Sequence, residues 1–220
     1  MCGRFYLDAQ QEELADYFDL PAAPELEARF NIAPSQSIAA VVAGEKGREL
    51  RRFRWGLIPF WARDGKIGYH TINARAETVE SKPAYRAAFR HRRCLIPASG
   101  FYEWKAQASG KQPYCIRPTQ AALFAFAGLY EHWQGPGGET IDSCTIIVTE
   151  ANPAMRAIHD RMPVILKPKD FAFWLDPTTQ QPARLKPLLR PWPDDDLTLY
   201  PVSKRVGNPS YDDPACIAAL

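Results

Sequence analysis

The sequence lacks any long uninterrupted run of apolar residues, and its beginning has no basic segment followed by an apolar one. A membrane-spanning helix needs about 18 or more such residues, and a secretory signal needs a basic segment followed by an apolar one. From these absences we expect a cytoplasmic protein without a membrane partner.

Patterns typical of metal sites and disulfide frameworks are also missing. The cysteines are five, an odd number, and neither they nor the four histidines show the paired spacing of zinc ligands. We therefore expect reduced thiols, no structural metal and no cofactor. The cysteines are Cys2, Cys94, Cys115, Cys144 and Cys216.

An excess of one charge is absent as well, since the formal net charge is only +2. Basic residues are nevertheless concentrated in two segments, which are either solvated faces or parts of a phosphate-binding groove. A groove would bind nucleic acid with an affinity that falls with salt, whereas solvated faces would not. The segments hold Arg48, Arg51, Arg52 and Arg54, and Arg86, Arg90, His91, Arg92 and Arg93.

No internal repeat, low-complexity linker or regular βαβ alternation divides the chain. Short alternating segments separated by 20 prolines and 13 glycines favour an α+β fold. We expect a single domain over residues 1–220, monomeric, with a curved mixed or antiparallel sheet or a barrel-like core and a few peripheral helices. Strands are predicted at residues 37–42, 50–55, 94–97, 100–105, 114–117, 123–130, 144–149 and 197–202, with a hairpin tip at 134–139.

Helices are predicted at residues 82–91, 153–158 and 169–175, and near the beginning of the chain. Asp8 and Gln11 have the spacing of a capping box that opens a helix ending near Phe18, with Pro21 and Pro24 beyond its end. Ser81 is the predicted cap of the helix at 82–91.

Cys2 becomes the first residue if the initiator methionine is removed. A terminal cysteine carries an amine and a thiol two carbons apart, so the amine can condense with an aldehyde and the thiol can close a five-membered thiazolidine ring. Both groups have pKa values of about 8, so a reactive site would need acid–base assistance at neutral pH. The alternative is that position 2 holds a small residue near a frayed end.

Three polar residues are candidates for that assistance. Glu103 stands among aromatic residues, where desolvation would raise its pKa and suit it to move protons; alternatively it faces outward from a strand. His159 could donate a proton to a sugar oxygen near pH 7, or it is a cation near a helix end. Asn73 could orient a substrate hydroxyl or the terminal amine, although asparagine is also common in turns.

Taken in order along the chain, these residues belong to a set of motifs that resembles the SOS-response-associated peptidase (SRAP) family. The motifs are MCGRF at residues 1–5, RFNIAP at 29–34, WGLIP at 55–59, NARAE at 73–77, GFYEW at 100–104, HDRMP at 159–163, PVS at 201–203 and VGN at 206–208.

The resemblance implies that the protein shields abasic sites in single-stranded DNA through a thiazolidine crosslink. It implies Cys2 as the nucleophile, surrounded by Asn73, Glu103 and His159. The phosphate-binding residues that it implies are Arg75 and Arg161, with Arg4 as a weaker candidate. It also implies location at the nucleoid when bound to DNA, and replication-fork proteins as further partners.

Aromatic residues could add contacts to unpaired bases. Trp61 and Trp104 are candidates for stacking on bases, or else they belong to the core. Trp61 lies in a segment from Phe60 to Tyr69 that lacks periodicity and could form a flexible lip.

Two other functions remain open at this point. The chain could be an autoprocessing peptidase that removes Met1 with Cys2 as nucleophile, or a non-covalent reader of damaged or modified DNA. A lyase side reaction, in which the imine leads to strand cleavage before the ring closes, accompanies the crosslinking hypothesis.

Overall fold

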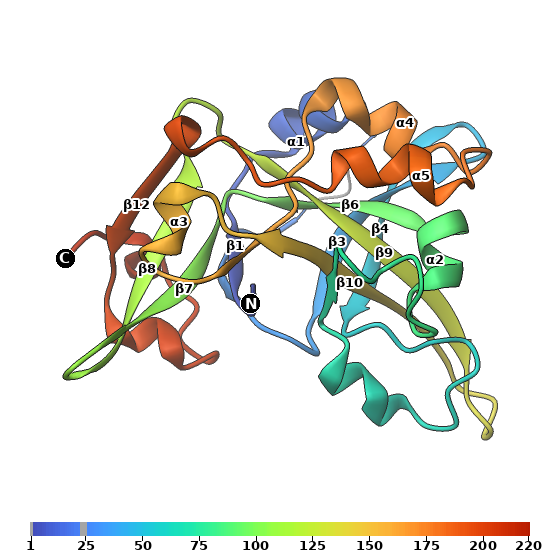
Figure 1. Ribbon diagram of the computed structural model, residues 1–220, viewed down its shortest axis with the longest axis horizontal. Helices are drawn as coiled ribbons and strands as arrows, with labels where there is room; N and C mark the ends of the chain where they lie inside the picture. Colours follow the sequence, from blue (N-terminus) through green and yellow to red (C-terminus); the bar gives the residue numbers. More distant parts are fainter. Residues whose placement is uncertain (1, 23–25) are drawn as a thin grey trace.

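The larger of two sheets contains a closed barrel. A computed structural model describes residues 2–22 and 26–220, and Figure 1 shows the arrangement of their strands. The barrel strands are β3 (Ser37–Gly44), β4 (Gly47–Trp55), β6 (Arg93–Ala98), β9 (Phe124–Gln134) and β10 (Thr140–Glu150). They follow the order β10-β4-β3-β6-β9, and β9 pairs again with β10, which closes the barrel. β4 is parallel to β10 and the other pairs are antiparallel, so the barrel is mixed.

The smaller sheet has the order β12-β8-β7-β1-β2. Its strands are β1 (Phe5–Leu7), β2 (Arg29–Ile32), β7 (Gly100–Gln107), β8 (Gly110–Pro118) and β12 (Leu197–Pro201). Two further short strands, β5 (Asn73–Arg75) and β11 (Arg161–Pro163), pair with β10. The end of β10 thus carries one short strand parallel to it and one antiparallel to it.

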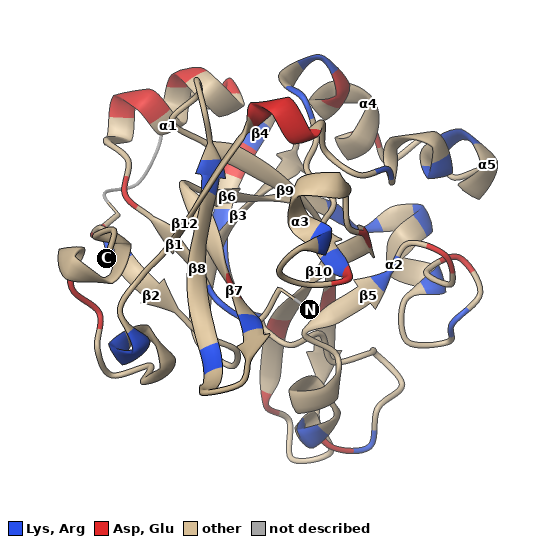
Figure 2. Cartoon of the chain, turned by 60° about the vertical axis from the view of Figure 1, so that its left-hand side comes forward, with Lys and Arg blue, Asp and Glu red and all other residues tan. Residues whose placement is uncertain are grey.

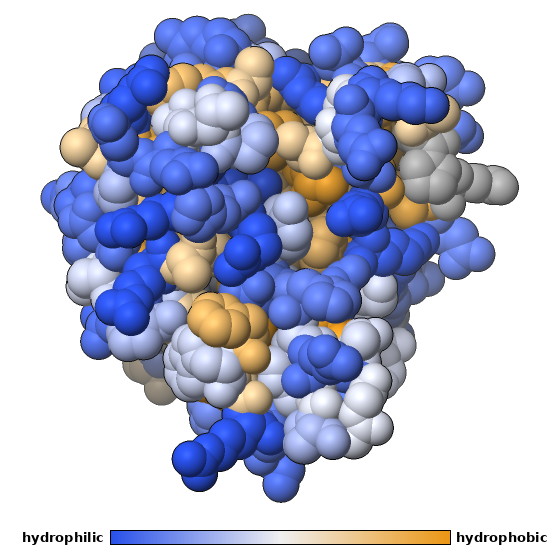
Figure 3. All heavy atoms as spheres, turned by 90° about the vertical axis from the view of Figure 1, so that its right-hand side faces the viewer, coloured by the Kyte–Doolittle hydropathy of each residue, from blue (hydrophilic) through white to orange (hydrophobic). Residues whose placement is uncertain are grey.

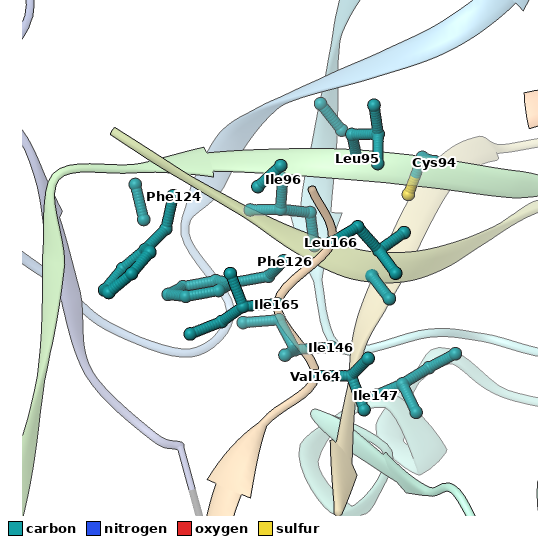
Figure 4. Packing of buried hydrophobic residues seen from close by; sticks show 14 of the residues in the cluster. Cys94, Leu95, Ile96, Phe124, Phe126, Ile146, Ile147, Val164, Ile165 and Leu166 are labelled. Atoms are coloured by element: carbon teal, nitrogen blue, oxygen red, sulfur yellow. The ribbon is translucent and has the colours of Figure 1, made fainter. Parts of the chain in front are cut away.

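The two sheets share one hydrophobic core. Phe5 of β1 contacts Trp55 and Phe126 of the barrel, with ring centroids 5.3 Å and 5.9 Å apart, and Phe101 of β7 lies 6.0 Å from Phe126. Figure 4 shows how Phe124 and Phe126 lie among aliphatic side chains of β6, β10 and the segment after β11. Aromatic contacts of this kind, together with the buried area, fix the first residues of the chain against the barrel.

A glycine allows the chain to pass directly from the barrel into the smaller sheet. β6 ends at Ala98 and β7 begins at Gly100. A Cβ atom at Gly100 would lie 2.5 Å from a ring carbon of Tyr6 and 2.6 Å from the carbonyl oxygen of Ile116. Only glycine fits this close approach, which places β7 between β1 and β8.

The helices are short and lie around the sheets. They are α1 (Gln11–Phe18), α2 (Arg86–His91), α3 (Pro153–Arg156), α4 (Phe171–Leu175) and α5 (Pro182–Leu185). The 3₁₀ helices are η1 (Gly65–His70), η2 (Pro168–Asp170), η3 (Lys186–Leu188), η4 (Asp194–Asp196), η5 (Lys204–Gly207) and η6 (Pro214–Ile217). α1 and α4 meet where Phe18 stacks on Phe171, with ring centroids 5.5 Å apart. α2 and α4 both pack against β6.

The α+β class, the barrel-like core and the predicted strands are confirmed. The predicted hairpin tip is also confirmed, since β9 and β10 are joined by residues 135–139. Two predicted helix caps and one predicted helix end are wrong.

Asp8 caps no helix, because α1 begins at Gln11 after Gln10, whose side chain makes no capping bond. Ser81 caps no helix either: its hydroxyl donates to the carbonyl of Thr78, and α2 begins only at Arg86. The helix predicted at 153–158 ends at Arg156, and the side chain of Asn152 caps its beginning by accepting from the backbone N–H of Met155. The Ser81 hydroxyl thus makes a local hydrogen bond in place of a helix cap. Pro24 lies outside the described residues.

None of the described helices is long and apolar enough to cross a membrane. The face on the right of Figure 1, where α2 and α5 lie, is covered mainly by hydrophilic side chains with small apolar patches between them (Figure 3).

Candidate functional site

Cys2 is fully buried near the start of the chain, three residues before β1 begins at Phe5. Its sulfur accepts a hydrogen bond from the backbone N–H of Arg4. Burial raises the pKa of the Cys2 thiol, and the carboxylate of Glu103 raises it further. The thiol is therefore protonated at neutral pH and needs a base before it can act as a nucleophile.

Glu103 lies on β7 and is buried, so it does not face outward from the strand. Side chains alternate along a strand, and Glu103 shares the face of Phe101, which belongs to the main core together with Cys2. Burial raises the pKa of Glu103, while the charge of His159 opposes that rise. The carboxyl group therefore exchanges a proton at a higher pH than an exposed glutamate does, as general acid–base chemistry requires.

His159 follows α3 in the loop that leads into β11, and its side chain is 29% exposed. Nδ1 of the ring accepts a hydrogen bond of 3.0 Å from the backbone N–H of Arg161 and lies 2.9 Å from a carboxylate oxygen of Asp160. The first contact requires a lone pair on Nδ1 and the second a proton. The neutral ring therefore makes the first contact with its proton on Nε2, and the protonated ring makes the second.

Asn73 begins β5 and donates from Nδ2 to the carbonyl of Ile146, at 3.4 Å. Its backbone carbonyl accepts from the hydroxyl of Tyr85, which joins β5 to the segment before α2. Its Oδ1 is buried and accepts no hydrogen bond from any described residue. A buried acceptor without a donor costs about 1 to 3 kcal/mol, so this oxygen is ready to receive a donor from a ligand.

Arg75 and Arg161 come from the two short strands on either side of β10. Both act on Glu77: Arg161 donates a hydrogen bond to its carboxylate, and Arg75 contributes charge. Partial burial would raise the pKa of Glu77, but its hydrogen bonds and these two cations bring the pKa below the usual value. The resulting cluster keeps two guanidinium groups at one end of β10.

Arg4, Trp104 and Trp61 lie in different surroundings. The guanidinium of Arg4 lies over the ring of Trp104, 5.8 Å from its centroid, and donates to oxygens of this chain. Trp104 is half-buried on β7, whereas Trp61 is 49% exposed. Trp61 borders a hollow of about 330 Å³ that Arg63, Lys66 and His70 also line. Trp61 therefore offers an accessible ring for stacking, and Trp104 presents a ring already covered on one side.

The two arginine segments of the sequence do not form one groove. Arg93 is buried and donates to the backbone carbonyls of Phe89, Arg90, Trp174 and Asp176, so it holds the fold together. Arg92 pairs with Glu131 at 2.8 Å, and Arg48 donates to the carbonyl of Phe18. The charge pattern of the sequence could not reveal that Arg48, Arg92 and Arg93 bind oxygens of the protein itself.

Two exposed arginines of the second segment, Arg86 and Arg90, form a basic face on and before α2 together with the exposed Lys82. No ion pair among the described residues includes these three side chains. In Figure 2, basic residues gather around α2, β5 and α5, whereas acidic residues gather on α1 and η4. The small net charge therefore hides an uneven distribution.

The structure brings Cys2, Glu103 and His159 into one electrostatic group and places Asn73, Arg75 and Arg161 around the end of β10. Sequence reasoning gave no role to Glu77 or Tyr85, which orient Arg161 and Asn73. Glu77 lies two residues after Arg75 within the NARAE motif, and this position is the feature of the sequence that indicates a role for Glu77 beside the arginines. No group of three or more described acidic, cysteine or histidine side chains is arranged to hold a metal ion.

Comparison with known proteins defines the class of this fold and site. The sequence model of the family described as SOS response associated peptidase (SRAP) matches residues 1–209. The chain belongs to this family.

Similar proteins include "Abasic site processing protein YoaM" of Bacillus subtilis, 46% identical over 95% of this chain and 94% of the relative. "Abasic site processing protein HMCES" of Xenopus tropicalis is 36% identical over 81% of this chain and 59% of the relative. A crystal structure of a protein from Bacteroides thetaiotaomicron superimposes with a TM-score of 0.88 over 100% of both chains, at 26% identity.

Proposed function

We propose that this protein processes abasic sites in single-stranded DNA by forming a thiazolidine between Cys2 and the ring-opened deoxyribose. The observation that carries the proposal is the burial of Cys2 beside Glu103. The charge of His159 in turn lowers the pKa of Glu103 and so links the three side chains. The relatives named as abasic site processing proteins support the substrate class. Met1 has to be removed first, and the small side chain of Cys2 suits ordinary methionine aminopeptidases, so self-cleavage is not required.

The reaction begins with opening of the abasic sugar, which is mainly a closed hemiacetal. The protonated ring of His159 donates a proton to the ring oxygen, the Glu103 carboxylate accepts the proton of the C1 hydroxyl, and the aldehyde forms. The neutral α-amine of Cys2 then attacks C1. Glu103 protonates the departing hydroxyl of the carbinolamine, so that water leaves, Glu103 becomes ionised and a protonated imine remains.

Ring closure completes the adduct. Glu103, now ionised, accepts the thiol proton, the sulfur bonds to C1, and the imine nitrogen ends protonated as the ring amine. The net change is the union of amine, thiol and aldehyde with the loss of one water. If closure is slow, loss of a proton from C2 of the imine permits β-elimination and strand cleavage, which is the proposed lyase side reaction.

The surrounding residues bind the substrate. Asn73 Oδ1, which lacks a donor among the described residues, accepts from a sugar hydroxyl or from the Cys2 amine. Arg75 and Arg161 contact the flanking phosphates, and Trp61 stacks on an unpaired base.

Intact mass spectrometry before and after incubation with an abasic single-stranded oligonucleotide tests the proposal. We expect a starting mass that lacks Met1 and a product heavier by the oligonucleotide less one water. The product should survive heat on a denaturing gel. A protein that binds the oligonucleotide and yields no heat-stable product would instead be a non-covalent reader.

The basic face of Lys82, Arg86 and Arg90 should carry part of the DNA affinity. Replacing all three with glutamine removes three phosphate contacts, and each contact contributes about 0.7 to the slope of log affinity against log salt for a single strand. We therefore expect the slope to decrease by about 2, measured by fluorescence anisotropy with an intact oligonucleotide.

The matched control replaces Lys46, Arg51 and Arg52 with glutamine, because these exposed residues on and beside the β3–β4 hairpin carry the same charge. Their loss should leave the slope almost unchanged. Equal slopes for both triple variants would show that only the total charge matters and that α2 makes no contact with DNA.

A further inference from the structure

Arg4 connects the nucleophile to the strand that carries Glu103. Its backbone N–H donates to the Cys2 sulfur, and its backbone carbonyl accepts from the N–H of Tyr102, at 2.9 Å. Tyr102 directly precedes Glu103 on β7. The position of the Arg4 backbone therefore determines how the thiol lies relative to the carboxyl group.

The side chain of Arg4 is held by neutral oxygens. Nη1 donates to Oδ1 of Asn31 at 2.8 Å and to the carbonyl of Val206 at 2.7 Å, and Nη2 lies 3.5 Å from the carbonyl of Gly207. No ion pair among the described residues includes this guanidinium. Burial lowers the pKa of Arg4 from its usual value, yet an arginine side chain remains charged, and the oriented carbonyl and amide dipoles stabilise that charge.

Asn31 is the residue on which these contacts converge. It is fully buried on β2, and its Nδ2 lies 3.2 Å, 2.9 Å and 2.6 Å from the carbonyl oxygens of Val206, Asn208 and Tyr211. An amide group offers two hydrogens and an acceptor oxygen, and here all of them are used. One side chain thus binds Arg4 on one side and three carbonyls of residues 206–211 on the other.

A second contact fixes the same segment to β2. Asp212 accepts from the backbone N–H groups of Phe30 and Asn31, at 2.5 Å and 3.0 Å, and pairs with Arg29 at 2.9 Å. The segment lies more than 170 positions from Asn31 in the sequence, and it is distant from Glu103 and His159 in the chain as well. Nothing in the proposed chemistry requires it.

We propose that Asn31 is a positioning residue for Cys2, and that residues 206–212 form the fixed support against which it holds Arg4. The inference rests on the proposed crosslinking function. Ring closure requires the sulfur to reach C1 while Glu103 accepts its proton. A displacement of about 1 Å can lower such a rate by about 100-fold, so a support of this kind affects the rate without touching the DNA.

The test is a single-turnover crosslinking experiment with saturating abasic oligonucleotide. For Asn31→Ala we expect the rate constant to fall by about tenfold or more. We also expect a larger share of cleaved strand, because a misplaced thiol captures the imine more slowly. The oligonucleotide concentration for half-maximal rate should stay within about twofold, since the fully buried Asn31 side chain has no surface with which to contact DNA.

The matched control is Arg93→Met, which removes hydrogen bonds from a buried side chain to backbone carbonyls elsewhere in the fold. A substitution that only destabilises the fold lowers the fraction of active protein and hence the final amount of crosslink. It does not change the rate constant or the share of cleaved strand. Arg93→Met should behave in this way.

A milder variant covers the case in which Asn31→Ala does not fold. Asp212→Ala removes the second contact at a partly exposed position, and we expect a decrease of about threefold in the rate constant with a higher share of cleavage. The positioning role is refuted under two conditions: the parent forms the crosslink, and each variant that folds differs from it only in the fraction of protein that crosslinks. If the parent itself forms no crosslink, the proposed function fails instead, so the two failures are distinguishable.

Discussion

Replacing Cys2 with alanine should abolish the heat-stable adduct with abasic DNA while leaving an N-terminal amine. The amine can still form an imine at C1, but no sulfur is present to close the ring. We therefore expect the adduct to fall below detection and cleavage of the strand to persist or increase. Denaturing gels that resolve crosslinked, cleaved and intact oligonucleotide measure both effects in one experiment.

Cys94→Ala is the matched control for this experiment. Cys94 is equally buried, but it lies on the barrel strand β6 and its sulfur packs against Gly128. Its loss should cost about 1 kcal/mol of stability through the lost methylene-sized volume and leave the adduct unchanged. A heat-stable adduct formed by the Cys2→Ala variant would remove the thiazolidine from the proposed function.

The barrel was predictable because its strands are rich in β-branched and aromatic residues that alternate or run continuously. The short strands β1, β2, β5 and β11 were not predicted. Each has three or four residues, too few to show a period, and each exists because a distant partner binds it, as when Phe5 pairs with Ile32 and Val148 pairs with both Arg75 and Pro163. Long-range pairing of this kind leaves no local signal.

The candidate site was predictable only as a set of motifs. The raised pKa expected for Glu103 is found, and burial is its main cause. The support of Arg4 by Asn31 and Val206 could not be predicted, since these partners lie 27 and 202 positions away in the sequence. Arg93 looked like a phosphate ligand for the same reason, because its carbonyl partners are set by the tertiary fold.

Replacing Glu103 with glutamine should lower the rate of crosslink formation by about 100-fold, and the rate of reversal as well. Glutamine keeps the shape but can neither give nor take a proton. In the parent, Glu103 must be ionised to accept the thiol proton, so the rate of closure falls as pH falls through its pKa. Because burial raises that pKa, the decrease should begin at a higher pH than for an exposed glutamate, and the glutamine variant should lack this inflection.

The same substitution should lower the pKa of the Cys2 thiol. The Glu103 carboxylate contributes to the raised pKa of Cys2, so its removal should lower the pH at which iodoacetamide alkylates the thiol. A more acidic thiol combined with a slower reaction would show that proton transfer, rather than thiolate supply, limits the rate. Glu131→Gln is the control, because Glu131 is also buried but pairs with Arg92 on the barrel. Parent-like crosslinking and reversal by the Glu103→Gln variant would exclude Glu103 from the chemistry.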